Sequence, residues 1–500
     1  MPRTRRLGAC AASVFLQAGV LLAGLALPAR ADTLPPLTDN QRDSLSQALR
    51  LWFGVMVEAA PDHLTITPAQ GHYDVSLPLA TMMGSAVQSG PLTTQAALLP
   101  DGRWALSAIT LPSPQNFPSP PPSPGAPATR VTLELSDQQA AATVDPTLKA
   151  PSEGEARFGP WSLRFEEQKN PLLLTVAHSQ TNMVFTPSSA GRVDAGTVSA
   201  LDHIVAVFPH GAGTEAGAPL RITMGSAQST LQLADVSPAL QATLTHQMIV
   251  LASVLPKSTA GHPAPPLSPA QRASLHALLA TLRALTHGVS LGIEAHDAVF
   301  AALHPVTLDS LSFSQRLQGQ DGRLALHLRL ALAGIGWPAM PQPLAAGAAY
   351  LPHHVVLAPS LGGVPEDDLF RLLDGMIDDP KLDPEAVMPD LDARLAATPI
   401  TAGIDALAFD LGPATIEGQG VFSIAGRHRL HGTADLTATH LDDLTAQVGR
   451  ERKAGPFVAA LIFLKGLAKI DGDRASWHIE YDGEKLLVNG QDLHEMLPPR

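Results

Sequence analysis

The stretch SFSQRLQGQDGRLALHLRL (Ser312–Leu330) alternates apolar and polar residues on both sides of Asp321-Gly322. Aspartate followed by glycine supplies the positive φ angles that a two-residue hairpin loop requires. With this loop, Leu317 pairs with Leu326 and Phe313 pairs with Leu330. The stretch therefore predicts an antiparallel hairpin of defined register.

The same register predicts which side chains share a face of this hairpin. Leu324 and Leu328 lie with Leu326 on one face, because side chains alternate along a strand. His327 and Arg329 point to the other face. One side is therefore predicted to be buried, and the other to be solvated or to line something.

Two further Asp-Gly pairs lie between alternating runs, at Asp101-Gly102 and at Asp482-Gly483. The second lies within SWHIEYDGEKLLVNG (Ser476–Gly490), where a two-residue loop would pair Trp477 with Val488 and Ile479 with Leu486 beside Tyr481. On the opposite face, the same loop would pair Glu480 with Lys485.

Other alternating stretches predict further strands, and periodic stretches predict helices. The strands are expected at Arg130–Leu135, Trp161–Phe165, Leu172–Ala177, Leu201–Phe208, Ile400–Leu411, Thr415–Ile424 and His428–Thr437. The helices are expected at Pro238–Leu255, Glu366–Ile377, Pro384–Ala396, Leu441–Arg450 and Phe457–Ile470. Consecutive hairpins indicate the α+β class, with a mainly antiparallel, curved sheet and amphipathic helices packed on it.

Two similar segments, PPLTDNQRDSLSQAL (Pro35–Leu49) and PPLSPAQRASLHALL (Pro265–Leu279), each begin with a capping box. Thr38 with Gln41, and Ser268 with Gln271, would satisfy backbone groups at the two helix starts. Convergent capping and an internal duplication into two related halves both explain the likeness, and both interpretations stay open.

The predicted organisation has a signal peptide, two halves and a linker. The signal peptide is residues 1–31, the N-terminal half is 32–256 with a Pro-rich loop at 112–127, the linker is 257–267, and the C-terminal α+β half is 268–500. The Pro-rich loop is expected to be an extended excursion between strands, because proline lacks the N–H that a central strand requires.

The N-terminus is typical of an exported protein. A basic start, an apolar segment and Ala29-Arg30-Ala31 predict cleavage after Ala31 and delivery to the periplasm, by either the general or the twin-arginine route. Cys10, the only cysteine, would leave with the signal.

Cleavage leaves 33 − 4 = 29 basic against 46 acidic residues, which opposes nucleic-acid binding. No transmembrane helix is expected after Asp32.

No motif predicts catalysis, a cofactor or a metal. The histidines lack the spacing of H-E-x-x-H, and no serine lies in G-x-S-x-G. By elimination, the aliphatic strand faces are the candidate site, either as a wall for an apolar ligand or as plain core. Its residues are Phe313, Leu324, Leu326, Leu328, Trp477, Ile479 and Tyr481.

The C-terminal third carries a family resemblance. PATIEGQGVFSIAGRHRLHGTADLTATHLDDL (Pro413–Leu444) and FVAALIFLKGLAKIDGDRASWHIEYDGEKLLVNGQDL (Phe457–Leu493) resemble an uncharacterised secreted family of Gram-negative bacteria, domain of unknown function 2125. LPHHVVLAPSLGGVP (Leu351–Pro365) resembles the middle of that family. The architecture is similar to AsmA-like envelope proteins, whose sheets are thought to handle lipids. The resemblance brings no catalytic residues.

Three functions are compared. The favoured hypothesis is a non-enzymatic periplasmic envelope protein that binds a lipid or other hydrophobic ligand, or assists envelope assembly. The alternative is a scaffold that binds envelope proteins through strand edges or the Pro-rich loop. An enzyme is the least favoured of the three.

Overall fold

The structure is a computed structural model of the 500-residue chain. It describes residues 35–53, 64–78, 90–119, 129–146, 148, 150–166, 172–189, 191–208, 220–238, 240, 243, 247, 267–285, 287–301, 305–338, 350–379, 391–426, 430–450 and 455–493. The predicted signal peptide, nearly all of the predicted linker 257–267 and most of the predicted helix Pro238–Leu255 lie outside these residues.

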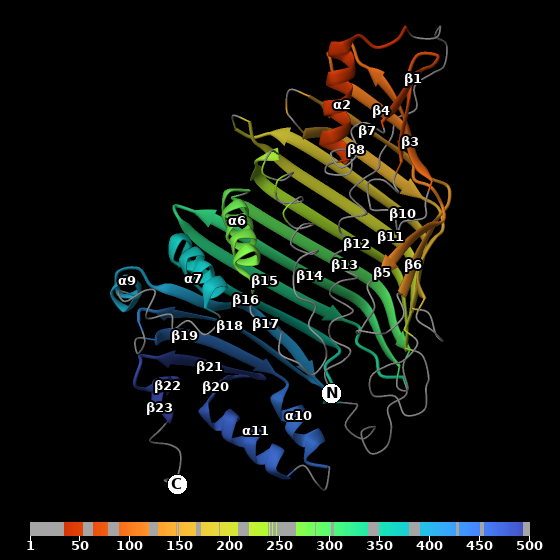
Figure 1. The fold of residues 1–500 in the computed structure, drawn as a ribbon. Coiled ribbons are helices and arrows are strands. Elements are labelled where there is room, and N and C mark those ends of the chain that lie inside the picture. The colour runs from red at the N-terminus through yellow and green to blue at the C-terminus, as the bar shows by residue number, and fades with distance from the viewer. Residues whose placement is uncertain are drawn as a thin grey trace. The chain divides into compact units, whose positions relative to one another are not determined.

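Strands dominate the described residues (Figure 1). The strands are β1 (Thr65–Pro68), β2 (Tyr73–Pro78), β3 (Pro91–Leu98), β4 (Trp104–Thr110), β5 (Gln115–Ser119), β6 (Thr129–Leu135), β7 (Gln139–Asp145), β8 (Ala150–Phe158), β9 (Trp161–Glu166), β10 (Leu172–Pro187), β11 (Val193–Phe208), β12 (Leu220–Val236), β13 (Gly288–Ala301), β14 (Val306–Gln320), β15 (Arg323–Ala333), β16 (His354–Pro365), β17 (Ile400–Leu411), β18 (Ala414–Ile424), β19 (Leu430–Thr439), β20 (Lys469–Asp471), β21 (Arg474–Tyr481), β22 (Leu486–Val488) and β23 (Gln491–Asp492). The helices are α2 (Asp39–Phe53), α6 (Pro269–Leu285), α7 (Glu366–Asp378), α9 (Leu391–Ala397), α10 (Leu441–Val448) and α11 (Gly455–Leu467).

The chain divides into two compact units. Unit 1 comprises Met1–Val289 and Phe300–Leu303, and unit 2 comprises Ser290–Val299 and His304–Arg500. The division falls within β13 rather than in the predicted linker 257–267, and α6 belongs to unit 1. Two hydrogen bonds hold the end of α6 there: the side-chain Nη1 of Arg192 donates to the carbonyl of Ala284, and the N–H of His287 donates to the carbonyl of Ala234.

Unit 1 has its core between α2 and an antiparallel sheet. The predicted capping box is confirmed, since the N–H of Thr38 donates to Gln41 Oε1 at 3.0 Å and that of Gln41 to Thr38 Oγ1 at 3.4 Å. Beyond it, the stripe of Leu45, Ala48 and Leu49 is fully buried in one cluster with Trp104. The indole N–H of Trp104 donates to Ser44 Oγ at 3.0 Å, so its only donor is satisfied.

The second capping box, at the start of α6, is confirmed as well. The N–H of Ser268 donates to Gln271 Oε1 at 2.7 Å, and that of Gln271 to Ser268 Oγ at 3.2 Å. Both boxes satisfy helix N-termini locally. The internal duplication remains a prediction, because local capping arises equally by convergence.

Unit 2 is organised by the hairpin of β14 and β15, and its predicted register is confirmed. Leu317 pairs with Leu326 and Phe313 with Leu330. Asp321 and Gly322 form the two-residue loop with φ of 52° and 70°. Positive φ at both positions matches the right-handed twist of the strands.

The other two Asp-Gly loops are longer than predicted. Leu98 pairs with Trp104, and Leu99 and Gly102 hydrogen-bond across a turn, so Asp101-Gly102 belongs to a wider loop. At the second, Tyr481 pairs with Leu486 and Ile479 with Val488, so the predicted register is wrong by two residues.

The cause of the second error is the side chain of Asp482. Its Oδ1 accepts the N–H groups of Glu484 at 3.0 Å and Lys485 at 2.7 Å, which closes a four-residue loop. The predicted pair of Glu480 with Lys485 is therefore wrong, and Glu480 lies opposite Leu487.

Two predicted boundaries also change. The helix predicted to reach Ile470 ends at Leu467, because Gly472-Asp473 forms a tight turn that pairs Lys469 with Ser476 as strand. Within the predicted Pro-rich loop 112–127, residues 115–119 form β5 against β6, and residues 120–127 lie outside the described residues. Among the described strands, β5 pairs with β6 alone, so it is an edge strand there. An edge strand tolerates Pro118, because its other side needs no N–H donor.

The loop between β14 and β15 yields a stability test. Substituting Gly322→Ala adds a Cβ where φ is +70° and no atom lies within 4 Å, so the cost is backbone strain alone. We expect a loss of about 1 kcal/mol in the free energy of unfolding. Urea unfolding measures it. Gly466→Ala in α11, which likewise has nothing within 4 Å, is the control and should not destabilise. Equal losses in both variants would contradict this account.

Candidate functional site

The candidate residues predicted from two separate hairpins lie on one face of the sheet of unit 2. Strand pairing carries this face across β14, β15, β16, β17, β18, β19 and β21 (Figure 1). We call it the apolar face. Its first row is Leu317, Leu326, Leu361, Ala402, Phe422, Gly432 and Tyr481. Its second row is Phe313, Leu330, Leu357, Leu407, Gly418, Leu436 and Trp477.

The remaining candidates lie between or beside these rows. Ile479 pairs with Ala434 and Val488, between the two rows. Leu324 and Leu328 alternate with Leu326 along β15 and therefore share its face. All seven predicted residues are thus on the apolar face, and each is partly rather than fully buried.

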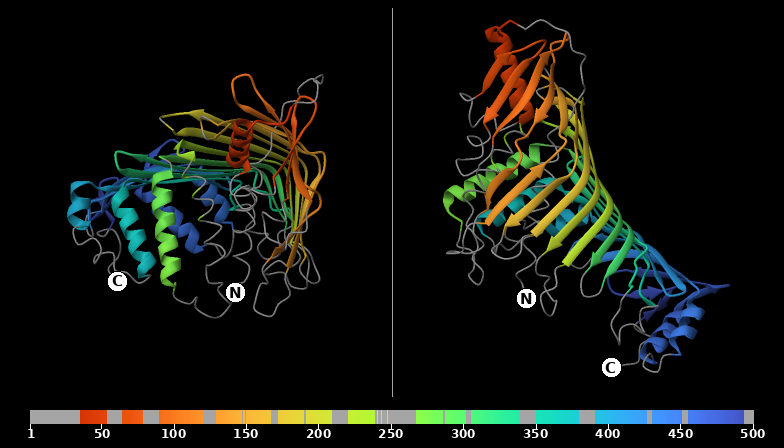
Figure 2. Two further views of the ribbon diagram at one scale, coloured as in Figure 1. Left: turned by 45° about the horizontal axis from the view of Figure 1, so that its top comes forward. Right: turned by 90° about the vertical axis from the view of Figure 1, so that its right-hand side faces the viewer.

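Part of the apolar face is covered by helices. The indole N–H of Trp477 donates to the carbonyl of Leu464 in α11 at 2.8 Å. Trp477 also packs against a cluster in which Leu444 and Val448 of α10 join Leu461 of α11. Figure 2 shows α7, α10 and α11 on the same side of this sheet. One end of the apolar face is therefore core.

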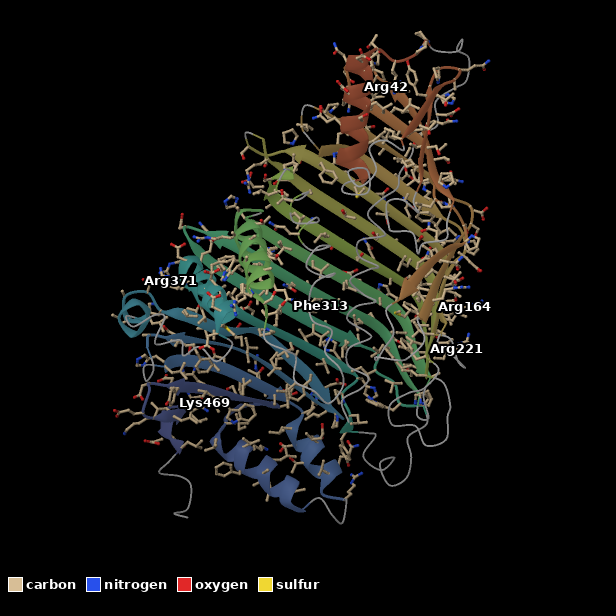
Figure 3. The ribbon with its side chains drawn as sticks, viewed as in Figure 1. Arg42, Arg164, Arg221, Phe313, Arg371 and Lys469 are labelled. Atoms are coloured by element: carbon tan, nitrogen blue, oxygen red, sulfur yellow. The ribbon has the colours of Figure 1, made fainter. Side chains whose placement is uncertain are left out.

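Farther from α10 and α11, large side chains of the apolar face are open. Leu357 is 39% exposed and Leu361 is 38% exposed. Their neighbours in the rows are Leu330, Leu326 and Phe313, the last of which is labelled in Figure 3. Exposed leucines clustered in this way are costly in water, and they mark a surface that something apolar can cover.

Two glycines of the apolar face are filled by side chains of the neighbouring strand. A Cβ at Gly432 would clash with a ring carbon of Phe422, and one at Gly418 would clash with a methyl carbon of Leu436. Phe422 and Leu436 therefore extend over the glycine backbone. The apolar face continues across positions that carry no side chain.

The opposite face of the same sheet is polar. Asp405 Oδ1 accepts the hydroxyl of Ser360 at 2.6 Å, and its Oδ2 lies 3.0 Å from His327 Nδ1. The hydrogen bond from Ser360, followed by that from His327, lowers the pKa of Asp405. The acid is the shared acceptor of this cluster.

A second polar cluster joins β19 to β21. His478 Nδ1 lies 2.6 Å from Asp435 Oδ1, and its Nε2 lies 2.9 Å from Glu480 Oε1. The hydrogen bond to Asp435 raises the pKa of His478, and the charges of both acids act in the same direction. His478 therefore links β19 to β21, and these contacts favour its protonated form.

A third polar cluster lies in unit 1, where the turn after β10 meets the end of β12. Asp235 Oδ1 accepts the hydroxyls of Ser188 and Ser189, both at 2.8 Å, and its Oδ2 lies 2.7 Å from Arg192 Nε. These contacts, the hydroxyls first, lower the pKa of Asp235 to about 2. His287 Nδ1 lies 2.9 Å from the same carboxylate.

Two of these clusters combine serine, histidine and aspartate, but in an order that differs from a catalytic triad. A triad requires histidine between the acid and the serine, so that it takes the hydroxyl proton. Around Asp405 and around Asp235, the acid itself accepts from serine and from histidine. In these two clusters the geometry is that of a joint between strands.

Among the residues described, no group of three or more His, Cys, Asp or Glu side chains has the arrangement of a metal site. None of the described helices is long and apolar enough to cross a membrane. Comparisons of the chain with family models, with curated proteins and with solved structures find no match. The resemblances to domain of unknown function 2125 and to AsmA-like proteins therefore stay predictions.

The sequence pattern does not indicate the members of the rows contributed by β16 and β17. Leu357 and Leu361 are separated by Pro359, which hides the alternation of β16, and a bulge between Ile404 and Leu407 interrupts the alternation of β17. The signal that remains is the pair of apolar stretches Leu351–Pro365 and Ile400–Leu411. Their register across the sheet is a tertiary property.

The His478 cluster predicts a pH dependence of stability. Because the pKa of folded His478 is raised above 6.5, its contribution is complete below about pH 6.5 and is lost as pH rises through the raised value. We expect the unfolding free energy of wild type minus that of His478→Gln to be larger at about pH 6 than at about pH 8.5. In the Asp435→Asn background, the free-energy effect of His478→Gln should change less between these two pH values, because the main partner of His478 has lost its charge. A difference that is constant with pH would contradict the assignment.

Proposed function

We propose that this chain is a non-enzymatic envelope protein of the periplasm and that it binds a hydrophobic ligand, a lipid acyl chain, on the apolar face of unit 2. The observation that carries the proposal is the pair of rows running from β14 to β21 with exposed leucines in β16. These leucines adjoin other apolar side chains of the rows, and a contiguous exposed apolar surface marks a binding site more often than single exposed leucines do.

The dimensions of the apolar face support an acyl chain. Adjacent strands lie about 4.8 Å apart, so the six steps from β14 to β21 span about 29 Å. One leaflet of a bilayer, and hence one acyl chain, occupies about 15 Å of the roughly 30 Å hydrocarbon core. A chain lying across the rows would contact four or so neighbouring strands.

The chemistry of the rows supports an apolar ligand as well. Their members are Leu, Phe, Ala, Gly, Tyr and Trp, whereas Asp405 of β17 and His478 of β21 lie on the opposite face. An acyl chain on these rows would bury no polar side chain that needs a hydrogen-bond partner. A polar head group would have to lie outside the rows.

The proposed compartment follows from the N-terminus. The predicted signal of residues 1–31 directs the chain to the periplasm. Because Cys10 is lost on cleavage, the remaining chain has no thiol that this oxidising compartment could oxidise. The resemblance to AsmA-like envelope proteins adds support to lipid handling as an analogy of architecture.

The test is lipid binding by the chain purified after export, without the predicted signal of residues 1–31. Native mass spectrometry after purification without detergent should show co-purified lipid, and a fluorescent fatty acid should bind in titration. Leu357→Asn places a polar amide on the apolar face and should weaken that binding about tenfold, because the amide loses its water under the acyl chain.

Val421→Asn is the matched control. Val421 is 51% exposed and pairs with Gly403 and Thr433 on the opposite face. Its substitution should leave the affinity unchanged. Equal weakening in both variants, or an apo mass with no titratable binding, would remove the proposal.

A further inference from the structure

α11 exposes apolar side chains on the side that faces away from its contact with α10. Leu461 is buried in the cluster with α10, whereas Ile462, Phe463 and Leu464 are 59%, 42% and 47% exposed. Ile470 in the following strand β20 is 51% exposed. These four residues, which we call the α11 patch, bring large hydrophobic side chains to the surface of unit 2.

The geometry of the α11 patch favours a fluid apolar phase as its occupant. Consecutive residues of a helix are about 100° apart, so Ile462, Phe463 and Leu464 cover an arc of about 200°. A folded protein surface meets a helix along a narrower stripe, whereas acyl chains can surround such a ridge. The thirteen residues of α11 span about 20 Å, too short to cross a bilayer core of about 30 Å.

Two lysines lie near the α11 patch. Lys465, the only charged residue of α11, is paired with Asp442. Lys469, next to Ile470, is exposed and has no ion pair with any residue that the structure describes. Figure 3 shows Lys469 beside the C-terminal end of α11. Its ammonium is free to meet a lipid phosphate while its methylenes follow the apolar side chains.

We propose that α11 docks this chain on a phospholipid surface, with the α11 patch in the boundary between head groups and acyl chains and with Lys469 at the phosphates. Apolar burial carries the binding, since Lys465 is already paired with Asp442. This docking is independent of the ligand proposed for the apolar face, because the two surfaces carry different residues.

Flotation with phospholipid vesicles tests the docking. The chain purified after export, without residues 1–31, should float with vesicles of phosphatidylethanolamine and phosphatidylglycerol. It should still do so when salt is raised from about 0.1 M to about 1 M, where the Debye length falls to about 3 Å. Replacing Ile462→Gln and Phe463→Gln together should lower the partition coefficient at least about tenfold. Val421→Gln, at an equally exposed apolar position of β18, should not change it.

A second measurement separates loss of docking from loss of fold. The chain without residues 1–31 contains no cysteine, so Phe463→Cys carries an environment-sensitive fluorophore on its single thiol, and Val421→Cys carries it in the control. Vesicles should blue-shift the emission only at position 463. Absence of flotation, loss of flotation in high salt, or a wild-type dimer that the double substitution converts to monomer would each overturn the proposal, the last by assigning the α11 patch to a second copy of the chain.

Discussion

The two-residue periodicity of strand side chains is the constraint on which unit 2 depends. A slip of one residue between β14 and β15 would carry Leu324, Leu326, Leu328 and Leu330 to the face that now holds His327 and Arg329. The loop at Asp321-Gly322 prevents that slip, because its positive φ angles admit one closing pair, Gln320 with Arg323. Each following strand inherits its facing from this hairpin through the ladder of hydrogen bonds.

The irregularities of the sheet preserve this facing rather than disturb it. Bulges between Leu324 and Leu326 and between Ile404 and Leu407 each add a residue on one strand, yet Leu361 still meets Leu326 and Leu407 still meets Leu357. On the polar face, Asp405 next to the second bulge bonds Ser360 and His327 of two neighbouring strands. The same local deformation therefore keeps the apolar rows continuous and creates a polar joint behind them.

Helices then divide the apolar face into core and open surface. α10 and α11 cover the end around Trp477, and the carbonyl of Leu464 takes up the indole proton. α11 is apolar on nearly all sides, so packing one side against α10 leaves Ile462 and Phe463 in solvent. The described helices are too few to cover both surfaces. The leucines of β16 and the outer side of α11 therefore remain exposed among the described residues.

Much of the local structure could be predicted from the sequence, and the candidate site only in part. The sequence by itself determined the capping boxes, the antiparallel hairpins, the β14–β15 register and the apolar character of seven candidate residues, because these depend on backbone preferences within a few residues. The tertiary structure decided that both hairpins share one face, that Leu357 and Leu361 join it, and that the loop at Asp482 shifts the last register. Those outcomes depend on pairing between residues far apart in the chain and on where a carboxylate finds its donors, and a local pattern contains neither.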